Sequence, residues 1–436
     1  MNRIIIIGNG FDKAHGLATG YRDFIDKYWT DFFGHIFGGY WRWLAENFKV
    51  INDPHPYEDE FVLFEVFRDK RHGVSRTSQS SSNPTPYGEV LEFIAKLNDP
   101  DKNYEGSVRL TFKNDFFGHI SGLCSVTNWL DIENEYYEKL KSLLAEENAV
   151  RRNERVRKLN EDFEAVKKRL ESYLTQIIGE AQIEQIPAIR EAFDCLIEFN
   201  DVAYEKQKLF VESILSRMIR IDKEAIITDN KERDSDYLLC RTQDDEHRHY
   251  VMKWLHNEDF RKTYCTPCNT LILNFNYTKT AQTLYAQDSD EIINIHGELG
   301  SDRNPIIFGY GDELDDDYKR IERLQDNDFL ENIKSVRYHE TGNYRRLLSF
   351  IESEPYQVVT MGHSCGNSDR TLLNTLLEHP NCISVKVYYH QHEDGTDDYS
   401  QLIRNLSRNF NDKAALRDKV VHKERCAPLV PVVVQK

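Results

Sequence analysis

The sequence predicts an α/β protein with a Rossmann-like parallel sheet that is split in the sequence by a large helical insertion. Residues 4–7 are four consecutive isoleucines that run into Gly8-Asn9-Gly10 and then into an amphipathic helical pattern. A short β-branched apolar run is typical of a strand buried on both faces of a parallel sheet. Further apolar runs alternate with helical patterns after about residue 265, and alternation of this kind indicates a doubly wound sheet. These strands are expected at residues 270–274, 291–295, 305–308, 357–361 and 384–389.

Three parts of the chain follow from this pattern. Residues 1–130 are expected to form the first part of the Rossmann-like domain, with a polar, turn-rich loop at 73–88. Residues 131–260 form the helical insertion, since apolar residues recur there at steps of three and four, as from Leu159 to Ile177. Residues 261–436 form the second part of the domain. No internal repeat is visible.

Composition narrows the class of protein. The chain has 436 residues, 40% of them hydrophobic, and a formal net charge of -17. Such acidity disfavours broad binding to nucleic acid or anionic membranes, and the basic run at 151–158 is interpreted as a solvated helix face. No apolar run approaches the roughly 20 residues that span a bilayer, and no signal peptide is visible. Eight cysteines scattered along a long chain are typical of reduced thiols, so we expect a cytoplasmic protein.

Cys265 and Cys268 are the one close cysteine pair. They could form half of a zinc site with His247, His249 or His256. A zinc ribbon would need a second CxxC, which the chain lacks. We therefore expect no metal and interpret the pair as packing at the start of a strand.

Polar clusters follow the predicted strands. They are residues 9–12, 274–278, 296–298, 309–312 and 362–369. Because the carboxyl ends of parallel strands meet at one edge of a sheet, these clusters are expected to converge on one cleft. Nucleotides and phosphates bind at that edge in open α/β sheets, so the sequence predicts a nucleotide site.

Several residues of these clusters have two interpretations. Gly8 and Gly10 let another group approach the backbone, or only make a strand-to-helix turn. His296 is a candidate general base, or a structural histidine at the strand end. Asn276 could orient a water molecule or a ribose, or close the strand with an Asx turn.

Four further residues are candidates. Asp12 belongs to the site or is a helix N-cap. Ser364 and Asn367 are expected to bind ribose or adenine. Asp369 binds nucleotide in this interpretation, or caps the helix expected from about residue 372.

Asp131 and Glu133 are two residues apart in a predicted helix. They do not share a helix face and are a poor catalytic pair by themselves. Each could still join the cleft from a neighbouring part of the chain.

Several motifs together resemble one protein family. They are GNGFDKAHGLATGYRDF, WLDIENEYY, NFNYT, IHGELG, IIFGYGD and GHSCGNSD, spread over nearly the whole chain. In this order they resemble the AbiH family of bacterial proteins associated with abortive infection against bacteriophage. Residues 145–260 carry no matching motif. The resemblance implies an antiphage role.

A more distant resemblance is to sirtuin-like NAD-consuming domains. Their arginine before an aromatic residue is similar to Arg22 here, their strand-end asparagine to Asn276, and their histidine-glycine pair to His296-Gly297. Their glycine-serine nucleotide loop is similar to the segment from Gly362 to Ser364. Thr278 departs from the usual aspartate, and the four-cysteine zinc module is absent. The resemblance thus implies cleavage of NAD or a related nucleotide rather than deacylation.

These observations lead to a working hypothesis of a cytoplasmic antiphage effector that cleaves NAD or a related nucleotide at the glycosidic bond. Its catalytic residues would be Asn276, His296 and Asp12. Its nucleotide-binding residues would be Gly8, Asn9, Gly10, Arg22, Gly362, Ser364, Asn367 and Asp369. The helical insertion would receive a phage-derived trigger or form a homo-oligomer.

Two alternatives use the same cleft. One is a nucleotide-sensing module without catalysis. The other is a nuclease in which Asp12, Asp131 and Glu133 hold magnesium.

Overall fold

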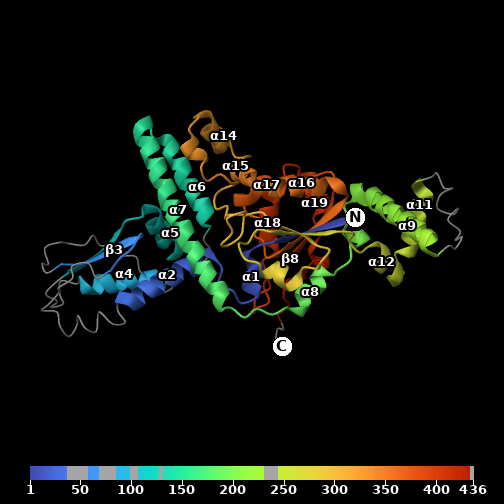
Figure 1. The fold of residues 1–436 in the computed structure, drawn as a ribbon, viewed down its shortest axis with the longest axis horizontal. Helices are drawn as coiled ribbons and strands as arrows, with labels where there is room; N and C mark the ends of the chain where they lie inside the picture. Colours follow the sequence, from blue (N-terminus) through green and yellow to red (C-terminus); the bar gives the residue numbers. More distant parts are fainter. Residues whose placement is uncertain (37–56, 68–84, 99–106, 127–130, 230–243, 433–436) are drawn as a thin grey trace.

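The computed structural model describes residues 1–36, 57–67, 85–98, 107–126, 131–229 and 244–432. The molecule is elongated (Figure 1). A parallel sheet lies between two outlying parts, one with α2, α4 and β3 and the other with α9 and α11. No helix in the described ranges is long and apolar enough to cross a membrane.

The central sheet has six parallel strands. They are β1 (Asn2–Ile7), β5 (Thr270–Asn274), β6 (Glu291–Asn294), β7 (Tyr356–Met361), β8 (Cys382–Tyr389) and β9 (Ala427–Pro428). Their spatial order is β6-β5-β1-β7-β8-β9. Numbered along the chain within this sheet, that order is 3-2-1-4-5-6, the order of the Rossmann fold. The split parallel sheet is therefore confirmed, with β1 in contact with β5 on one side and β7 on the other.

The isoleucine run is buried on both faces of the sheet, which explains its composition. Ile4 and Ile6 pack with α16 (Asn343–Ser353), α17 (Arg370–Glu378) and α18 (Tyr399–Asn409). Ile5 and Ile7 face the opposite way and pack with α1 (Asn9–Ala14), α8 (Pro187–Phe193) and α13 (Thr280–Tyr285). Successive side chains of a strand point to opposite faces, so the run serves two apolar clusters.

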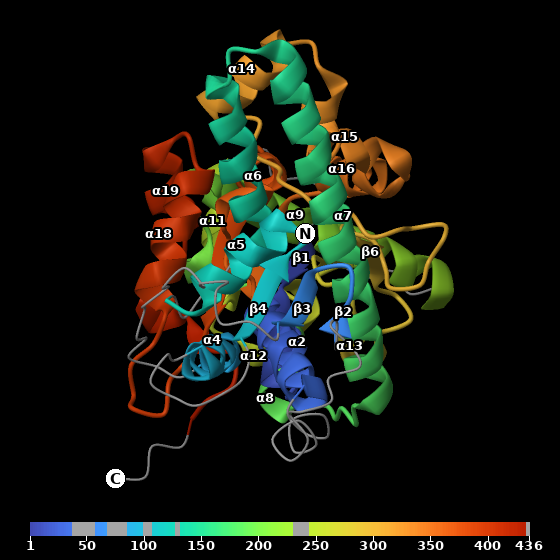
Figure 2. The same cartoon turned by 90° about the vertical axis from the view of Figure 1, so that its left-hand side faces the viewer.

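Described residues of the predicted insertion are largely helical. The helices are α6 (Ile132–Ser142), α7 (Ala149–Glu180), α8, α9 (Gln207–Asp229), α11 (Asp244–Trp254) and α12 (Glu258–Tyr264). They occupy two sides of the sheet (Figures 1 and 2). Helices α6 and α7 share one apolar cluster with α2 (Tyr21–His35) and α5 (Asp115–Cys124), whereas α9 and α11 belong to another. The residue limits of the three parts stay a prediction.

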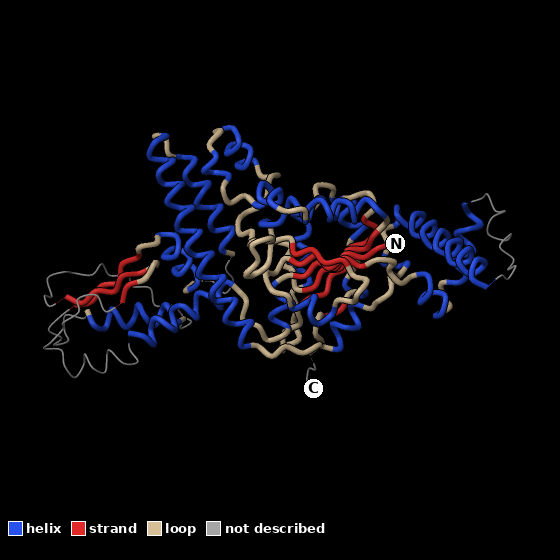
Figure 3. The backbone as a smooth tube through the Cα atoms, viewed as in Figure 1, coloured by secondary structure: helices blue, strands red, loops and turns tan. Residues whose placement is uncertain are grey.

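A second sheet lies within residues 1–130 and was not anticipated. Its antiparallel strands are β2 (Tyr57–Glu58), β3 (Val62–Phe67) and β4 (Ser107–Phe112), seen apart from the main sheet in Figure 3. The predicted loop at 73–88 falls mostly outside the described residues. Its end is helical, because Thr85 accepts a hydrogen bond from the Gly88 amide and a proline begins α4 (Pro86–Leu97).

The prediction of a strand at residues 305–308 is wrong. This segment is a loop in which Ile306 and Phe308 pack into one apolar cluster and Ile307 into another. Its Ile307 amide donates to the His296 carbonyl rather than to a sheet neighbour. The apolar run at residues 305–308 therefore reflects burial of its side chains in two apolar clusters, and its backbone does not pair with a strand.

Candidate functional site

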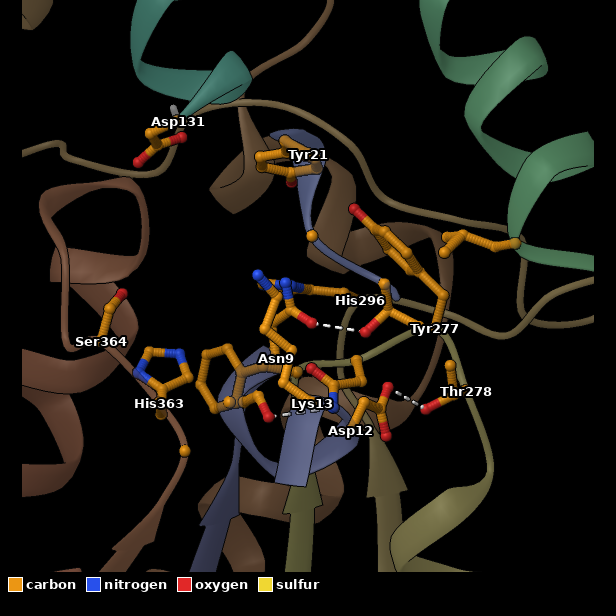
Figure 4. A pocket seen from close by; sticks show the side chains of 18 of the residues that line it. Asn9, Asp12, Lys13, Tyr21, Asp131, Tyr277, Thr278, His296, His363 and Ser364 are labelled. Atoms are coloured by element: carbon orange, nitrogen blue, oxygen red, sulfur yellow. Dashed lines mark hydrogen bonds between the residues drawn. The ribbon is translucent and has the colours of Figure 1, made fainter. Parts of the chain in front are cut away.

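A cavity of about 340 Å³ lies at the carboxyl edge of the sheet, where β1 separates β5 from β7 (Figure 4). This is the point where the strand order reverses, at which Rossmann-like folds bind ligands. Ten of the predicted residues line it: Gly8, Asn9, Gly10, Asp12, Arg22, Asn276, His296, Gly362, Ser364 and Asp369. Asn367 is not in the lining. Asp131 and Glu133 join it from the start of α6, and Leu170 and Leu174 from α7.

The glycine turn packs directly against the loop after β7. A Cβ on Gly8 would lie 2.4 Å from the Cα of His363, and one on Gly10 would lie 2.9 Å from the Cα of Gly362. The Gly10 amide donates to the Gly362 carbonyl at 2.8 Å. The group that approaches these glycines is therefore another loop of the protein. Their role as nucleotide contacts stays a prediction.

A buried ionic network forms one wall of the site. The Nζ of Lys334 lies 2.8 Å from Oδ1 of Asp369 and 3.0 Å from Oε2 of Glu133. Asp369 also faces two imidazoles, with Oδ1 3.2 Å from Nε2 of His296 and Oδ2 3.5 Å from Nε2 of His363. Lys334 begins α15 (Lys334–Arg337) and is fully buried.

Burial and charge set the protonation of this network. Burial opposes ionisation of Asp369, but Lys334 and His296 outweigh it and hold the pKa of that carboxyl well below its usual range. Burial raises the pKa of Glu133 to about 7, although Lys334 opposes the shift. Burial lowers the pKa of His296 to about 4, and the charge of Lys334 adds to this effect. His296 is therefore neutral near pH 7 and can accept a proton.

Asp12 is not a helix N-cap, because that position in α1 is taken by Gly8. Its Oδ2 accepts a hydrogen bond from the Thr278 hydroxyl at 2.7 Å (Figure 4). Burial raises the pKa of Asp12 to about 6, with the Thr278 hydrogen bond opposing it. Thr278 stands where sirtuin-like domains have an aspartate. Here its hydroxyl is hydrogen-bonded to the Asp12 carboxylate, which follows the glycine turn.

Asn276 joins two loops of the site. Its Nδ2 donates to the Gly8 carbonyl at 3.0 Å. The Asx turn at this strand end is made instead by Asn274, whose Oδ1 accepts from the Asn276 amide and whose Nδ2 donates to the Thr278 carbonyl. Asn276 is thus left to face the cavity.

Asp369 directly precedes α17, but its side chain makes no cap hydrogen bond. It is committed to Lys334 and the two histidines. Sequence reasoning considered Glu133 but missed Lys334 and His363. His363 lies in a cluster already chosen, whereas nothing in the local pattern marks Lys334.

The cysteine pair lies away from this cavity. Cys265 is buried in the apolar cluster of α9 and α11. The sulfur of Cys268 lies 3.6 Å from the terminal amine of Met1. His249 and His256 are exposed, and the side chain of His247 lies outside the described residues. Across the described ranges, no group of three or more His, Cys, Asp or Glu side chains is placed to hold a metal ion. The zinc question stays a prediction.

Fold and site together define a Rossmann-like α/β protein whose switch-point cleft is lined by buried carboxylates and two histidines, with a buried lysine paired to two of the carboxylates. The profile of the family described as bacteriophage abortive infection AbiH matches residues 4–390. The chain therefore belongs to the AbiH family, which points to a role in abortive infection against phage. No curated protein and no solved structure shows significant similarity to it.

Proposed function

We propose that the cleft binds NAD or a related nucleotide and hydrolyses its N-glycosidic bond. The observation that supports this is the convergence of Asn276, His296 and Asp12 on one cavity at the switch point of the sheet. In this reaction the bond from ribose C1′ to the base breaks and its electron pair leaves with the base. A water oxygen attacks C1′ and gives its proton to His296.

The charges of the cavity suit that transition state. Positive charge develops on the ribose as the bond breaks, and a nearby carboxylate stabilises it. Asp12, with a pKa raised to about 6 by burial, is mostly ionised near pH 7. Asn276 carries no charge and can hold a ribose hydroxyl or the attacking water. The remaining nucleotide contacts would come from Asn9, Arg22 and Ser364, which line the cavity.

The proposal places the protein in the cytoplasm, where NAD is available during infection. A phage-derived trigger or self-association through the helical parts would control it. A magnesium-dependent nuclease that uses Asp12, Asp131 and Glu133 is less well supported, because Glu133 is already paired with the Lys334 ammonium at 3.0 Å. In the described ranges these carboxylates are also not grouped to hold a metal ion.

Incubation of the purified full chain with NAD and a panel of nucleotides, followed by mass spectrometry, tests the proposal. We expect release of nicotinamide, and a loss of about 10²–10⁴-fold in rate for His296→Ala. His422→Ala is the matched control, because that side chain is 63% exposed. Failure of the wild type to cleave any nucleotide would refute the proposal. Tight binding without turnover would favour a sensing module, and metal-dependent cutting of nucleic acid would favour a nuclease.

A further inference from the structure

The carboxylate of Asp369 receives three cationic or polar donors at once, although nothing in the reaction requires it to touch substrate. We propose that Asp369 is a positioning residue that fixes the proton of His296 on Nε2 and leaves Nδ1 to accept the proton of the attacking water. Lys334 keeps Asp369 ionised for this purpose. The inference rests on the proposed function in giving His296 the role of base.

Hydrogen-bond chemistry selects this tautomer. An ionised carboxylate has only acceptor sites, so a ring nitrogen that faces it must carry the hydrogen. Nε2 of His296 lies 3.2 Å from Oδ1 of Asp369. The Tyr338 hydroxyl, also 3.2 Å from Nε2, can donate or accept and fits either tautomer. Asp369 is therefore the group that determines the tautomer of His296.

His363 provides an internal comparison. Its Nδ1 accepts the backbone N–H of Cys365 at 2.9 Å, so its proton is on Nε2, which faces Oδ2 of Asp369. Both histidines thus point a protonated Nε2 at the same carboxylate. The free lone pair of His363 is already used by the backbone, whereas within the described chain Nδ1 of His296 has no hydrogen-bond partner. Of the two imidazoles, it is therefore His296 that keeps a lone pair to accept a proton.

Phe275 keeps the two imidazoles apart. Its ring centroid lies 5.0 Å from that of His296 and 4.4 Å from that of His363, with tilted, near edge-on geometry to both. The Phe275 ring thus contacts both imidazoles, and each imidazole faces a different oxygen of Asp369.

Lys334 explains why Asp369 stays an acceptor. A protonated Asp369 could donate to His296 and reverse the tautomer. Lys334 prevents this with a full positive charge at 2.8 Å, and Glu133 on α6 holds the other side of the ammonium. Glu133 is itself fixed by the Gly309 amide, which donates to Oε1 at 3.0 Å.

The tautomer can be read by ¹⁵N NMR of the full chain labelled at histidine, with the His296 signal assigned from its absence in His296→Ala. We expect a neutral, Nε2-protonated ring in the wild type. In Asp369→Asn the amide can turn its NH₂ toward the ring, so the signal should move toward the Nδ1-protonated form. The rate of nucleotide cleavage should fall by up to about 10⁴-fold, the loss seen for an acid-to-amide change behind the histidine of a catalytic triad.

Asp312→Asn is the matched control. Asp312 is as buried as Asp369 and pairs with Arg370 at 3.1 Å, but it contacts neither histidine. It should leave both the tautomer and the rate unchanged. An Nδ1-protonated His296 in the wild type would overturn the inference even if Asp369→Asn fails to fold, as would an unchanged tautomer in that variant. Because the NMR measurement needs no nucleotide, an Nε2 tautomer lost in Asp369→Asn without any cleavage would refute only the proposed function.

Discussion

Replacing Lys334 by methionine should destabilise the protein, and by more at high pH than at low pH. Lys334 is fully buried between Glu133 and Asp369, with N–O separations of 3.0 and 2.8 Å. Removing one partner of a buried ion pair leaves an uncompensated charge and costs about 3–5 kcal/mol. Methionine keeps most of the apolar stem, so the loss is mainly electrostatic.

The pH dependence follows from Glu133. Burial raises its pKa to about 7 from the ordinary value of 4.5, so the folded protein binds this proton more tightly than the unfolded chain does. The associated stability is fully present below about pH 4.5 and is lost as the pH rises through about 7. A shift of this size corresponds to about 3 kcal/mol. Without Lys334 the pKa of Glu133 rises further, and a proton replaces the missing cation at low pH.

Urea unfolding near about pH 5 and about pH 8 measures the effect. The free-energy difference between wild type and Lys334→Met should be larger at the higher pH, where Glu133 and Asp369 both lose their cation, than at the lower pH, where Glu133 is protonated. Asp12 titrates in this range in the folded protein and His296 in the unfolded chain, so the wild type must be compared with the variant at each pH. The control is Lys419→Met, since the buried Lys419 ammonium donates, among the described residues, to the carbonyls of Leu377 and His379 and to no carboxylate. An equal loss at both pH values for Lys334→Met, or none, would refute the reasoning.

Three further predictions concern packing, charge and metal. Gly8→Ala should lower the melting temperature, because its Cβ would lie 2.4 Å from the His363 Cα, with a cost of about 1–3 kcal/mol. Gly34→Ala in α2 meets nothing within 4 Å and should match or exceed the wild type; equal melting of both variants would contradict the packing argument. Asp12→Asn should stabilise the protein at about pH 8 by up to about 3 kcal/mol and not at about pH 4, since the raised pKa marks a buried carboxylate; an unchanged pH profile would count against this. Elemental analysis should find no zinc, and one equivalent lost together with stability in Cys265→Ser would contradict that prediction.

The parallel sheet, and the convergence of its strand ends on one edge, could be predicted from the sequence. Four consecutive isoleucines predict a strand that is buried on both faces. The parallel topology of the sheet then brings the ends of distant strands to one edge. The run at 305–308 shows the limit of this reasoning, because apolar side chains report burial and not the hydrogen bonds of the backbone. Gly8 and Gly10 show another limit, because glycine permits a close approach without identifying what approaches.

The buried ionic network around Lys334 could not be predicted from the sequence, for a different reason. Lys334 lies on a four-residue helix, and its two partners come from α6 and from the turn before α17. A buried lysine cannot be distinguished from a surface lysine by its neighbours in sequence. Asp369 was chosen from its position after a strand, yet its contacts with the lysine and two histidines depend wholly on the assembled fold.

The strands of the central sheet are far apart in the sequence, and this affects the stage of synthesis at which the cleft can form. β1 ends at Ile7, whereas its neighbours begin at Thr270 and Tyr356, and Asp369 comes later still. During synthesis the first strand must wait for most of the polypeptide before it finds a partner, and closing such long loops is slow. A nascent or prematurely terminated chain that stops before Asp369 holds several helices but no assembled cavity. For a protein of abortive infection, the chemistry proposed above would then be confined to chains that extend beyond Asp369.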